Sequence, residues 1–410
     1  FFPPPPPPPP ILSGLVGSEM CIRDRVISIM EEVVKKKVDI HRGLVGVYFD
    51  RTKTTFINGK EGILEYRGYS IHDLAEKSTF EETAYLLLYG ELPNKVQLQR
   101  FDSDLKSSRD IPKEIIDIIK TIKDSHPMDV LRTAVSALSS FDPEVSDKSA
   151  EATLRKGIRL TAQVPTIVMA HNALRQNKTP IPPNSNLSHA ANFLYMLDGV
   201  EPSENTAKLM DKDFILHADH GSNASAFAAR VSAGTQADLH SAITTGVAVL
   251  SGPSHGGAAE NVMKMVKEVG SPENAKAYVT NLLKSKERVM GFGHRVYKSQ
   301  DPRAGHLKEG VENLSKEMGQ PGWYEILTAV MDAMKPYQRR GIHVNVDFFA
   351  GVIYHLLGIP TDLFVPIFAV GRIPGWTIQV VEQYNNNILL RPLLEYTGEH
   401  ERKYIPVQER

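Results

Sequence analysis

Apolar residues recur at helical spacing through most of this chain, and this period constrains the fold more than any other feature. Thr79 offers an N-cap with an acid three residues later at Glu82, and Gly90 and Pro93 end the predicted helix. The same period predicts buried helix faces at Ala84, Leu87 and Leu88, at Ile115, Ile118, Ile119 and Ile122, and at Leu131, Ala134, Val135 and Leu138. We therefore expect a mainly α protein.

One N-terminal region departs from the helical period. Residues Val47 to Ile57 are rich in β-branched and aromatic side chains, Asn58-Gly59 is typical of a tight turn, and Ile63 to Tyr66 can return antiparallel. A minor β element is expected here. The proline-rich stretch Asn177 to Asn186 predicts a loop, and the glycine-rich stretch Ser251 to Gly257 is a candidate hinge.

Residues 1–29 do not read as part of a folded protein. Pro3 to Pro10 is an uninterrupted proline run, and the segment Gly14 to Asp24 resembles a translated sequencing adapter. We interpret residues 1–29 as a sequencing or translation artefact or a disordered tail, with a genuine proline-rich tail as the alternative. Cys21, the single cysteine, lies in this stretch, so disulfides, zinc ribbons and cysteine nucleophiles are not expected.

Charge and hydropathy argue against two classes of partner. The formal net charge of −1 gives no support for a nucleic-acid-binding surface. The run Ser241 to Ala259 is uncharged, but Pro253 and His255 make it a poor membrane span, and Val26 to His41 is too charged for a secretory signal. We expect a cytoplasmic protein, and a chain of 410 residues is long enough for two domains.

Three short segments hold the residues expected to do chemistry. They are Gly252-Pro-Ser-His255-Gly-Gly257, Gly291-Phe-Gly-His294-Arg-Val296 and Asn345-Val-Asp347-Phe-Phe349. Glycines beside a histidine permit close approach of the backbone to a ligand. Two histidines and one acid can remove a proton from a carbon acid and stabilise the enolate.

Asp347 stands in an apolar setting between Val346 and Phe348. Such surroundings disfavour the ionised carboxylate, so we expect a raised pKa and a stronger base. Asp347 is also a candidate N-cap for a helix predicted over Phe348 to Leu357. The two roles are compatible.

Together these segments resemble the citrate synthase family, and the similarity extends from about Gly43 to Tyr404. The resemblance implies a two-domain, mainly α fold, with a large helical domain formed by residues 30–256 and 358–410 and a small domain formed by residues 257–357. The small domain would carry His294 and Asp347, with His255 near the junction, so that closure assembles the site.

The implied reaction joins acetyl-CoA to oxaloacetate in the tricarboxylic acid cycle. Asp347 would take a methyl proton from the thioester while neutral His255 hydrogen-bonds to the thioester oxygen. His294 would then supply a proton or hydrogen bond to the alkoxide, and the citryl thioester would be hydrolysed. No cofactor is expected, because coenzyme A enters as part of a substrate.

The resemblance also assigns the binding residues. Arg303, Arg372 and Arg391 stand at the family's substrate-carboxylate positions, His220 matches its substrate-binding histidine, and Arg67 is a further candidate. Arg391 would reach the neighbouring subunit's site in a homodimer. The residues expected to contact coenzyme A are Val289, Met290, Gly291, Phe292 and Gly293.

Several alternatives stay open from the sequence. His217-x-x-His220 with Asp219 could suggest a metal site, but the further ligands of a metal-hydrolase motif are missing, so no metal is predicted. 2-Methylcitrate synthase, which uses propionyl-CoA, shares the catalytic residues, and one methylene contributes only ~1–3 kcal/mol to discrimination. A citrate-cleaving lyase, a thioesterase and a non-catalytic helical dimer are further candidates. Gly221, Ser254 and the residues after Pro392 depart from the family pattern.

Overall fold

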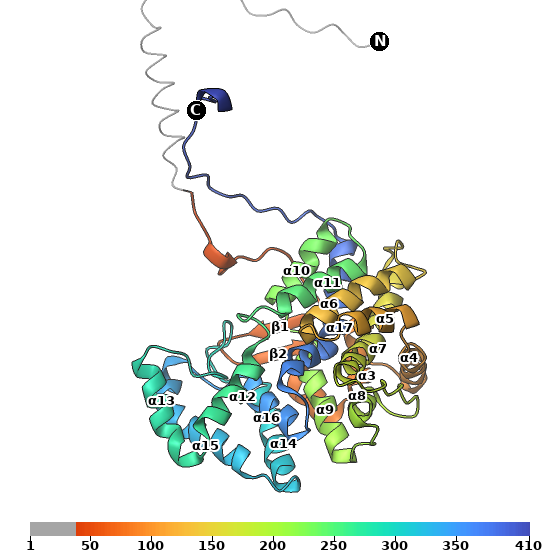
Figure 1. The fold of residues 1–410 in the computed structure, drawn as a ribbon, viewed down its shortest axis with the longest axis vertical. Coiled ribbons are helices and arrows are strands. Elements are labelled where there is room, and N and C mark those ends of the chain that lie inside the picture. The colour runs from red at the N-terminus through yellow and green to blue at the C-terminus, as the bar shows by residue number, and fades with distance from the viewer. Residues whose placement is uncertain (1–37) are drawn as a thin grey trace, which may run out of the picture. The chain divides into compact units, whose positions relative to one another are not determined.

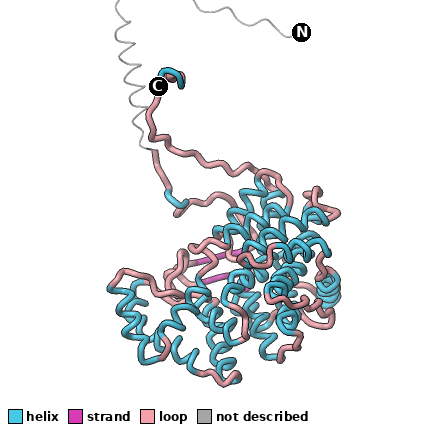
Figure 2. The backbone as a smooth tube through the Cα atoms, in the orientation of Figure 1, coloured by secondary structure: helices cyan, strands magenta, loops and turns pink. Residues whose placement is uncertain are grey.

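The computed structural model describes residues 38–410 of the chain. The predicted artefact, residues 1–29 with Cys21, lies outside the described residues. The described chain divides into two compact units, one formed by residues 52–390 and the other by residues 38–51 with 391–410. The second unit contains two short 3-10 turns, Arg42–Leu44 and Val407–Glu409. Helices make up nearly all the regular structure (Figure 2), so the prediction of a mainly α protein is confirmed.

The compact unit of residues 52–390 holds every α-helix described below. Its helices are α2 (Ile71–Lys77), α3 (Phe80–Tyr89), α4 (Lys95–Ser107), α5 (Lys113–Thr121), α6 (Pro127–Leu138), α7 (Ala150–Arg175), α8 (His189–Asp198), α9 (Glu204–His217), α10 (Ala224–Gly234), α11 (Leu239–Leu250), α12 (Ala258–Val269), α13 (Ala275–Lys284), α14 (Ala304–Glu317), α15 (Gly322–Met334), α16 (Asp347–Leu356) and α17 (Phe364–Asn385). Short 3-10 turns lie at Ser139–Phe141, Pro272–Asn274, Lys335–Arg340 and Thr361–Leu363.

The predicted caps of α3 are confirmed. The Thr79 side chain accepts a hydrogen bond from the Glu82 backbone N–H, and Gly90 ends the helix in the left-handed conformation with φ of 94°. Both contacts satisfy backbone groups that a helix terminus leaves unpaired. The apolar positions predicted for α3 and α6 are all buried, which places these helices in the core.

The expected β element is a three-stranded antiparallel sheet of β1 (Thr55–Asn58), β2 (Ile63–Tyr66) and β3 (Tyr69–Ser70). The strand predicted from Val47 was too long. The observed strand β1 begins at Thr55, because the four residues of β2 pair with nothing before Thr55. Asn58 does begin the turn, but four residues rather than two separate it from Ile63. β-branched composition alone does not supply a partner strand.

Helix α17 forms the centre of one group of helices (Figure 1), and packs against α3, α7, α9, α10 and α11. Nearly all its side chains are buried. Within residues 38–410, the segment Thr361–Asn385 passes a length-and-hydropathy test for a membrane span, and 94% of its most apolar window is covered by the rest of the protein. Core helices of globular proteins pass the same test.

Helices α12 to α16 form a second group (Figure 1), in which α12 and α14 pack on α16 and α13 packs on α15. A single cluster of buried apolar residues runs through both groups, from Leu64 in β2 to Val380 in α17. The division into a large domain and a small domain of residues 257–357 stays a prediction.

Candidate active site

His220 follows the C-terminus of α9, and its side chain is buried. The segment passes very close to α17 at Gly375, where an added Cβ would lie 2.1 Å from the Ala218 carbonyl oxygen. Only a glycine permits this approach. The His220 Nε2 lies 3.1 Å from the hydroxyl oxygen of Tyr297, which fixes the orientation of the ring.

The loop before His294 is joined by its backbone to the segment before Asp347. Phe292 and Val344 form an antiparallel bridge, and the Gly293 N–H donates to the carbonyl oxygen of His343 at 2.8 Å. The His294 motif and the Asp347 motif lie about fifty residues apart in the sequence, yet the pairing of Phe292 with Val344 brings their backbones together. The His294 ring in turn lies 5.2 Å from the His220 ring, centroid to centroid.

The hydrogen bonds of His294 define its tautomer. The backbone N–H groups of Val296 and Tyr297 both donate to Nδ1, each at 3.1 Å. An N–H group can only donate, so Nδ1 is the acceptor and the neutral ring carries its proton on Nε2. His294 can therefore donate a hydrogen bond through Nε2.

His255 has the opposite tautomer. It lies in the turn between α11 and α12, where its Nε2 accepts from the Ser225 backbone N–H at 3.3 Å and lies 2.8 Å from the Ser225 hydroxyl oxygen. The proton of the neutral ring is therefore on Nδ1. Ser225 is itself held by Trp376, whose indole N–H donates to its hydroxyl at 3.2 Å, and by Asn223 at 2.8 Å.

Burial keeps these histidines neutral. It lowers the pKa of His255 to about 4, and the positive charge of Arg372 adds to the effect. Burial likewise lowers the pKa of His294 to about 4, with a contribution from Arg303. The pKa of His220 lies well below its usual range for the same reasons. At neutral pH all three rings can act as hydrogen-bond donors without carrying charge.

Asp347 is the first residue of α16, and Val346 holds the N-cap position. The predicted helix start was therefore one residue late, and the N-cap interpretation of Asp347 was wrong. The side chain is partly buried, and the loss of hydration raises its pKa, as predicted from its apolar neighbours.

Arg372 presents two unpaired nitrogens in the protein interior. Its side chain is 1% exposed, its Nε donates to the His217 carbonyl oxygen, and its guanidinium lies 4.6 Å from the centre of the Phe368 ring. Its Nη1 and Nη2 have no hydrogen-bond partner within residues 38–410. Burial lowers its pKa to about 10, so it is charged at neutral pH. A buried guanidinium fork of this kind suits a carboxylate ligand.

Arg303 is also buried, but much of its guanidinium is paired. Its Nε and Nη2 donate to the two carboxylate oxygens of Asp301 at 3.0 and 2.8 Å. Asp301 also accepts from the Val346 backbone N–H at 3.3 Å, which links Arg303 to the start of α16. A fixed arginine of this kind is preorganised for an anion.

The other two predicted arginines lie elsewhere in the described chain: the contacts of Arg67 are with backbone carbonyls, and Arg391 belongs to the other compact unit. Arg67 directs its guanidinium at backbone carbonyls, with Nη2 at 2.8 Å from the Leu87 oxygen and Nη1 at 3.3 Å from the Lys53 oxygen. This is the pattern of a residue that stabilises the fold. Arg391 belongs to the second compact unit, formed by residues 38–51 and 391–410. The substrate roles of both arginines stay predictions.

The stretch predicted to contact coenzyme A has a constrained backbone. Gly291 and Gly293 have φ of 78° and 80°, in the left-handed region that favours glycine. A Cβ at Gly291 would also lie 2.5 Å from Phe348. Val289 is buried, whereas Met290 and Phe292 are partly buried. Their coenzyme A contacts stay predictions.

Sequence reasoning missed several residues that hold the cluster together. Ser225 orients His255 from α10, and no motif marks it, because a serine near a helix start usually serves the backbone. Tyr297 contacts both His220 and His294 and directly follows the second motif. Asp301 stands two residues before Arg303, so a search for acids beside the predicted arginines would have found it.

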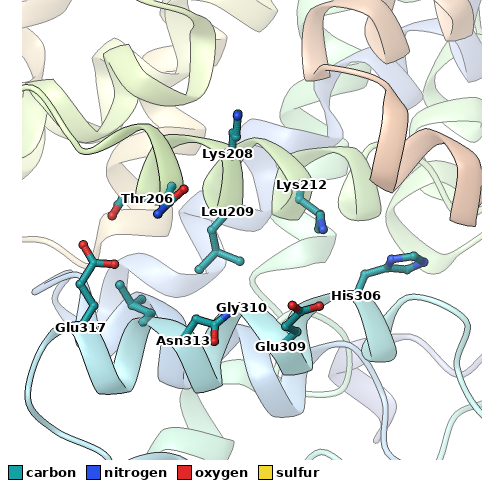
Figure 3. A pocket seen from close by; sticks show the side chains of 11 residues that line it. Thr206, Lys208, Leu209, Lys212, His306, Glu309, Gly310, Asn313 and Glu317 are labelled. Atoms are coloured by element: carbon teal, nitrogen blue, oxygen red, sulfur yellow. The ribbon is translucent and has the colours of Figure 1, made fainter.

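Two surface cavities flank α14. One of about 300 Å³ lies between α9 and α14, where Leu209 and Lys212 face Gly310 and Glu309 (Figure 3). The other, of about 660 Å³, lies at the N-terminal end of α14 and includes Asp301 in its wall. Within residues 38–410 no cluster of three or more His, Cys, Asp or Glu side chains has the geometry of a metal site.

Comparison with known proteins assigns the family. Residues 43–393 match the family described as citrate synthase, C-terminal domain. The chain belongs to the citrate synthase family. This citrate synthase family member is 44% identical over 377 residues to a citrate synthase of Deinococcus radiodurans, with 91% of this chain and 99% of that protein covered. It is also 41% identical to 2-methylcitrate synthase 2 of Corynebacterium glutamicum, covering 91% of this chain and 98% of that protein.

Solved citrate synthases share the fold of this family member. The Thermoplasma acidophilum enzyme, determined as a ternary complex with carboxymethyl coenzyme A and oxaloacetate, superposes with a TM-score of 0.86. The two chains are 32% identical, and the match covers 91% of this chain and 100% of that one. The resemblance seen in the three sequence motifs is thereby confirmed at the level of family and fold.

Proposed function

We propose that this protein is a citrate synthase, which condenses acetyl-CoA with oxaloacetate and hydrolyses the citryl thioester to citrate and coenzyme A. The observation that carries the proposal is the pair of neutral histidines held in opposite tautomers, together with a carboxyl of raised pKa whose segment is bridged to the His294 loop. Family membership adds weight, since relatives at 44% identity bear the name citrate synthase.

The first step removes a proton from the thioester methyl group. Asp347 takes this proton: the C–H bond breaks, an O–H bond forms, and the electron pair moves onto the thioester oxygen. The Nδ1–H of His255 donates a hydrogen bond to that oxygen and stabilises the enolate. A raised pKa suits Asp347 to this task, because a stronger base abstracts a weakly acidic proton more readily.

The second step forms the carbon–carbon bond. The enolate carbon attacks the keto carbon of oxaloacetate, and the Nε2–H of His294 donates to the alkoxide that develops. Water then hydrolyses the thioester and releases coenzyme A. The two unpaired nitrogens of Arg372 would bind one oxaloacetate carboxylate, and Arg303 and His220 would complete the binding of the substrate. No resident cofactor or metal takes part in this proposal.

The experiment is to follow free thiol release from acetyl-CoA and from propionyl-CoA, each with and without oxaloacetate. Faster release from acetyl-CoA that depends on oxaloacetate supports citrate synthase. A higher kcat/KM with propionyl-CoA would assign 2-methylcitrate synthase instead, a candidate favoured by the 41% identity to such an enzyme. Release without oxaloacetate would overturn the proposal in favour of a thioesterase.

The assembly we propose is a homodimer in the cytoplasm, in which Arg391 serves the neighbouring subunit's site. The support is the family resemblance at Arg391. Sedimentation equilibrium tests the assembly: a mass near twice the 45.5 kDa of the chain supports it, and a monomer that retains full turnover contradicts it. Cell fractionation tests the location.

A further inference from the structure

The β1–β2 hairpin holds Asp219, the residue just before His220, at two points. Thr55 and Tyr66 are directly paired across the two strands, so their side chains lie on one face of the sheet. The Thr55 hydroxyl donates to Asp219 Oδ2. The Tyr66 hydroxyl donates to the Asp219 backbone carbonyl at 2.8 Å and accepts from the Asp219 N–H at 3.2 Å. This cross-strand pair therefore fixes both the carboxylate and the backbone of Asp219.

The carboxylate of Asp219 in turn shapes the backbone at His220. Its Oδ2 also accepts from the Gly221 N–H at 3.0 Å, two residues later, which closes an Asx turn around His220. Gln379 of α17 is a further and longer partner of the same oxygen, at 3.4 Å. The oxygen that closes the turn is the one that Thr55 binds, so β1 anchors the backbone that carries the His220 ring.

The turn at the closed end of the hairpin holds the loop that follows His294. The Lys298 N–H donates to the Gly59 carbonyl oxygen at 2.8 Å, and the Ser299 hydroxyl donates to the same oxygen at 3.3 Å. A Cβ at Gly59 would lie 2.3 Å from the Val296 carbonyl oxygen, so only glycine permits this approach. The Val296 N–H is one of the two donors that orient the His294 ring.

The hairpin thus contacts the chain segments of two histidines that lie against each other. The His220 and His294 rings are 5.2 Å apart, centroid to centroid, and Tyr297 packs on both. His220 follows α9, which packs on α17, whereas the His294 loop leads into α14, which packs on α16. In Figure 1, β1 and β2 lie between these two groups of helices. One small sheet therefore holds both segments in place.

We propose that the β1–β2 hairpin sets the spacing between His220 and His294, and that Thr55 is the positioning residue that acts on His220 through Asp219. The inference deepens the proposed function and rests on it for the role of the two histidines in binding oxaloacetate. Thr55 need not touch the substrate. Its hydroxyl keeps the turn at His220 aligned with the His294 loop, so that both rings reach one bound oxaloacetate.

Thr54 provides a matched control beside Thr55. Its side chain is also buried, and its hydroxyl also donates to a carboxylate, that of Glu382 in α17, at 2.8 Å. Glu382 is held in turn by the Lys53 N–H and by Arg230. Loss of the Thr54 hydroxyl therefore tests the general cost of removing a buried hydroxyl from this strand, without removing a hydrogen bond to Asp219.

The first test compares Thr55→Val with Thr54→Val in steady-state thiol release from acetyl-CoA. Valine keeps the shape of threonine and removes the hydroxyl. In Thr55→Val the KM for oxaloacetate should rise about 10-fold, the size expected when one buried hydrogen bond is lost, and the KM for acetyl-CoA should change by less than about 2-fold. Thr55→Ser, which keeps the hydroxyl, should restore the KM for oxaloacetate, and Thr54→Val should leave it unchanged.

The second test needs no turnover. The full-length protein, labelled with nitrogen-15 at histidine and free of substrates, gives ring signals that His220→Gln and His294→Gln assign by NMR. Thr55→Val should shift the His220 signals, whereas Thr54→Val should not. Gly59→Ala, whose Cβ meets the loop, should shift the His294 signals. Ser299→Ala removes one hydrogen bond to Gly59 without adding an atom, and should shift them less.

Three results would overturn the inference. They are an equal rise in the KM for oxaloacetate in Thr54→Val and Thr55→Val, a Thr55→Ser variant as impaired as Thr55→Val, and His220 signals that do not move in Thr55→Val. His294 signals unchanged in both Gly59→Ala and Ser299→Ala would also contradict it. A wild-type protein that releases no thiol with oxaloacetate contradicts the proposed function instead, and the ring signals still report whether the hairpin positions the histidines.

Discussion

Phe292 and Val344 form an isolated antiparallel bridge that ties the loop carrying His294 to the segment leading into Asp347. The Asn345 backbone N–H also donates to the Gly291 carbonyl oxygen at 2.9 Å. Since Asp347 begins α16 two residues later, the base and the histidine are positioned as one unit. A disturbance of either segment should therefore affect both catalytic groups.

Gly291→Ala should weaken both the fold and the activity. The new Cβ would meet Phe348 at 2.5 Å in a backbone with φ of 78°, and overpacking of this kind costs about 1–3 kcal/mol. Gly293→Ala is the control, because its φ of 80° imposes the same strain but no atom lies within 4 Å of the new Cβ. Urea denaturation and kcat should show the larger loss in Gly291→Ala. Equal losses would mean that the contact with Phe348 has no effect.

Asp347→Asn should lower kcat by about 10²–10⁴, the usual contribution of a positioned general base. The amide keeps the size of the side chain but cannot take a proton. The measurement is oxaloacetate-dependent thiol release from acetyl-CoA. A variant with wild-type kcat would refute the assignment of the base.

Ser225→Ala should lower kcat more than it raises the KM for oxaloacetate. The Ser225 hydroxyl lies 2.8 Å from His255 Nε2 and accepts from Trp376, so its loss frees the ring to rotate while the Ser225 backbone N–H remains. One neutral hydrogen bond contributes about 0.5–1.5 kcal/mol, which predicts a loss of about 2- to 13-fold. Ser225→Thr, which keeps the hydroxyl, should retain more activity. An equal loss in both variants would point to packing instead.

Arg372→Lys should raise the KM for oxaloacetate strongly. Lysine cannot keep the Nε contact to the His217 carbonyl and also offer two parallel donors to a carboxylate. Hydrogen bonds to charged groups contribute about 1.5–3 kcal/mol, which corresponds to about 13- to 160-fold in kcat/KM. Steady-state kinetics with oxaloacetate as the varied substrate checks this. The KM for acetyl-CoA should change much less.

The stability of the fold should fall as pH rises, through Asp211. Burial and the nearby Glu81 raise the pKa of this carboxyl from 3.8 to about 8. The folded state keeps a proton that the unfolded chain releases, so this contribution is complete below pH 3.8 and is lost between pH 4 and 8. Asp211→Asn should flatten the pH dependence of the free energy of unfolding from pH 5 to 8. Parallel curves for the two proteins would contradict this.

The buried helix faces could be predicted because apolar residues recur at helical spacing in the local sequence. The motif histidines could be predicted because glycines stand beside them. Caps such as Thr79 and Gly90 have a local physical cause, so α3 was placed correctly. The start of α16 was missed by one residue, since an aspartate suits either the N-cap or the first turn of a helix. The strand over Val47 to Ile57 was overextended because strand pairing depends on a partner elsewhere in the chain.

Most supporting contacts of the site could not be predicted, although Asp301 could have been found from its position beside Arg303. Ser225 meets His255 only because α10 and the turn before α12 are brought together by tertiary packing. Arg67 was a weaker candidate in sequence than the other arginines, and its contacts with Leu87 and Lys53 distinguish it from Arg372 in the structure. Residue type indicates what a side chain can do, whereas packing decides which partner it meets.

The central position of α17 has a consequence for how the chain is made. Helices α3, α7, α9, α10 and α11 leave the ribosome before residues 364–385, against which they pack. Until then their apolar faces have no central partner, and such exposed surfaces are prone to aggregation. The nascent chain therefore completes its core only when nearly all of residues 52–390 have been synthesised, and this interval is where a chaperone would be needed most.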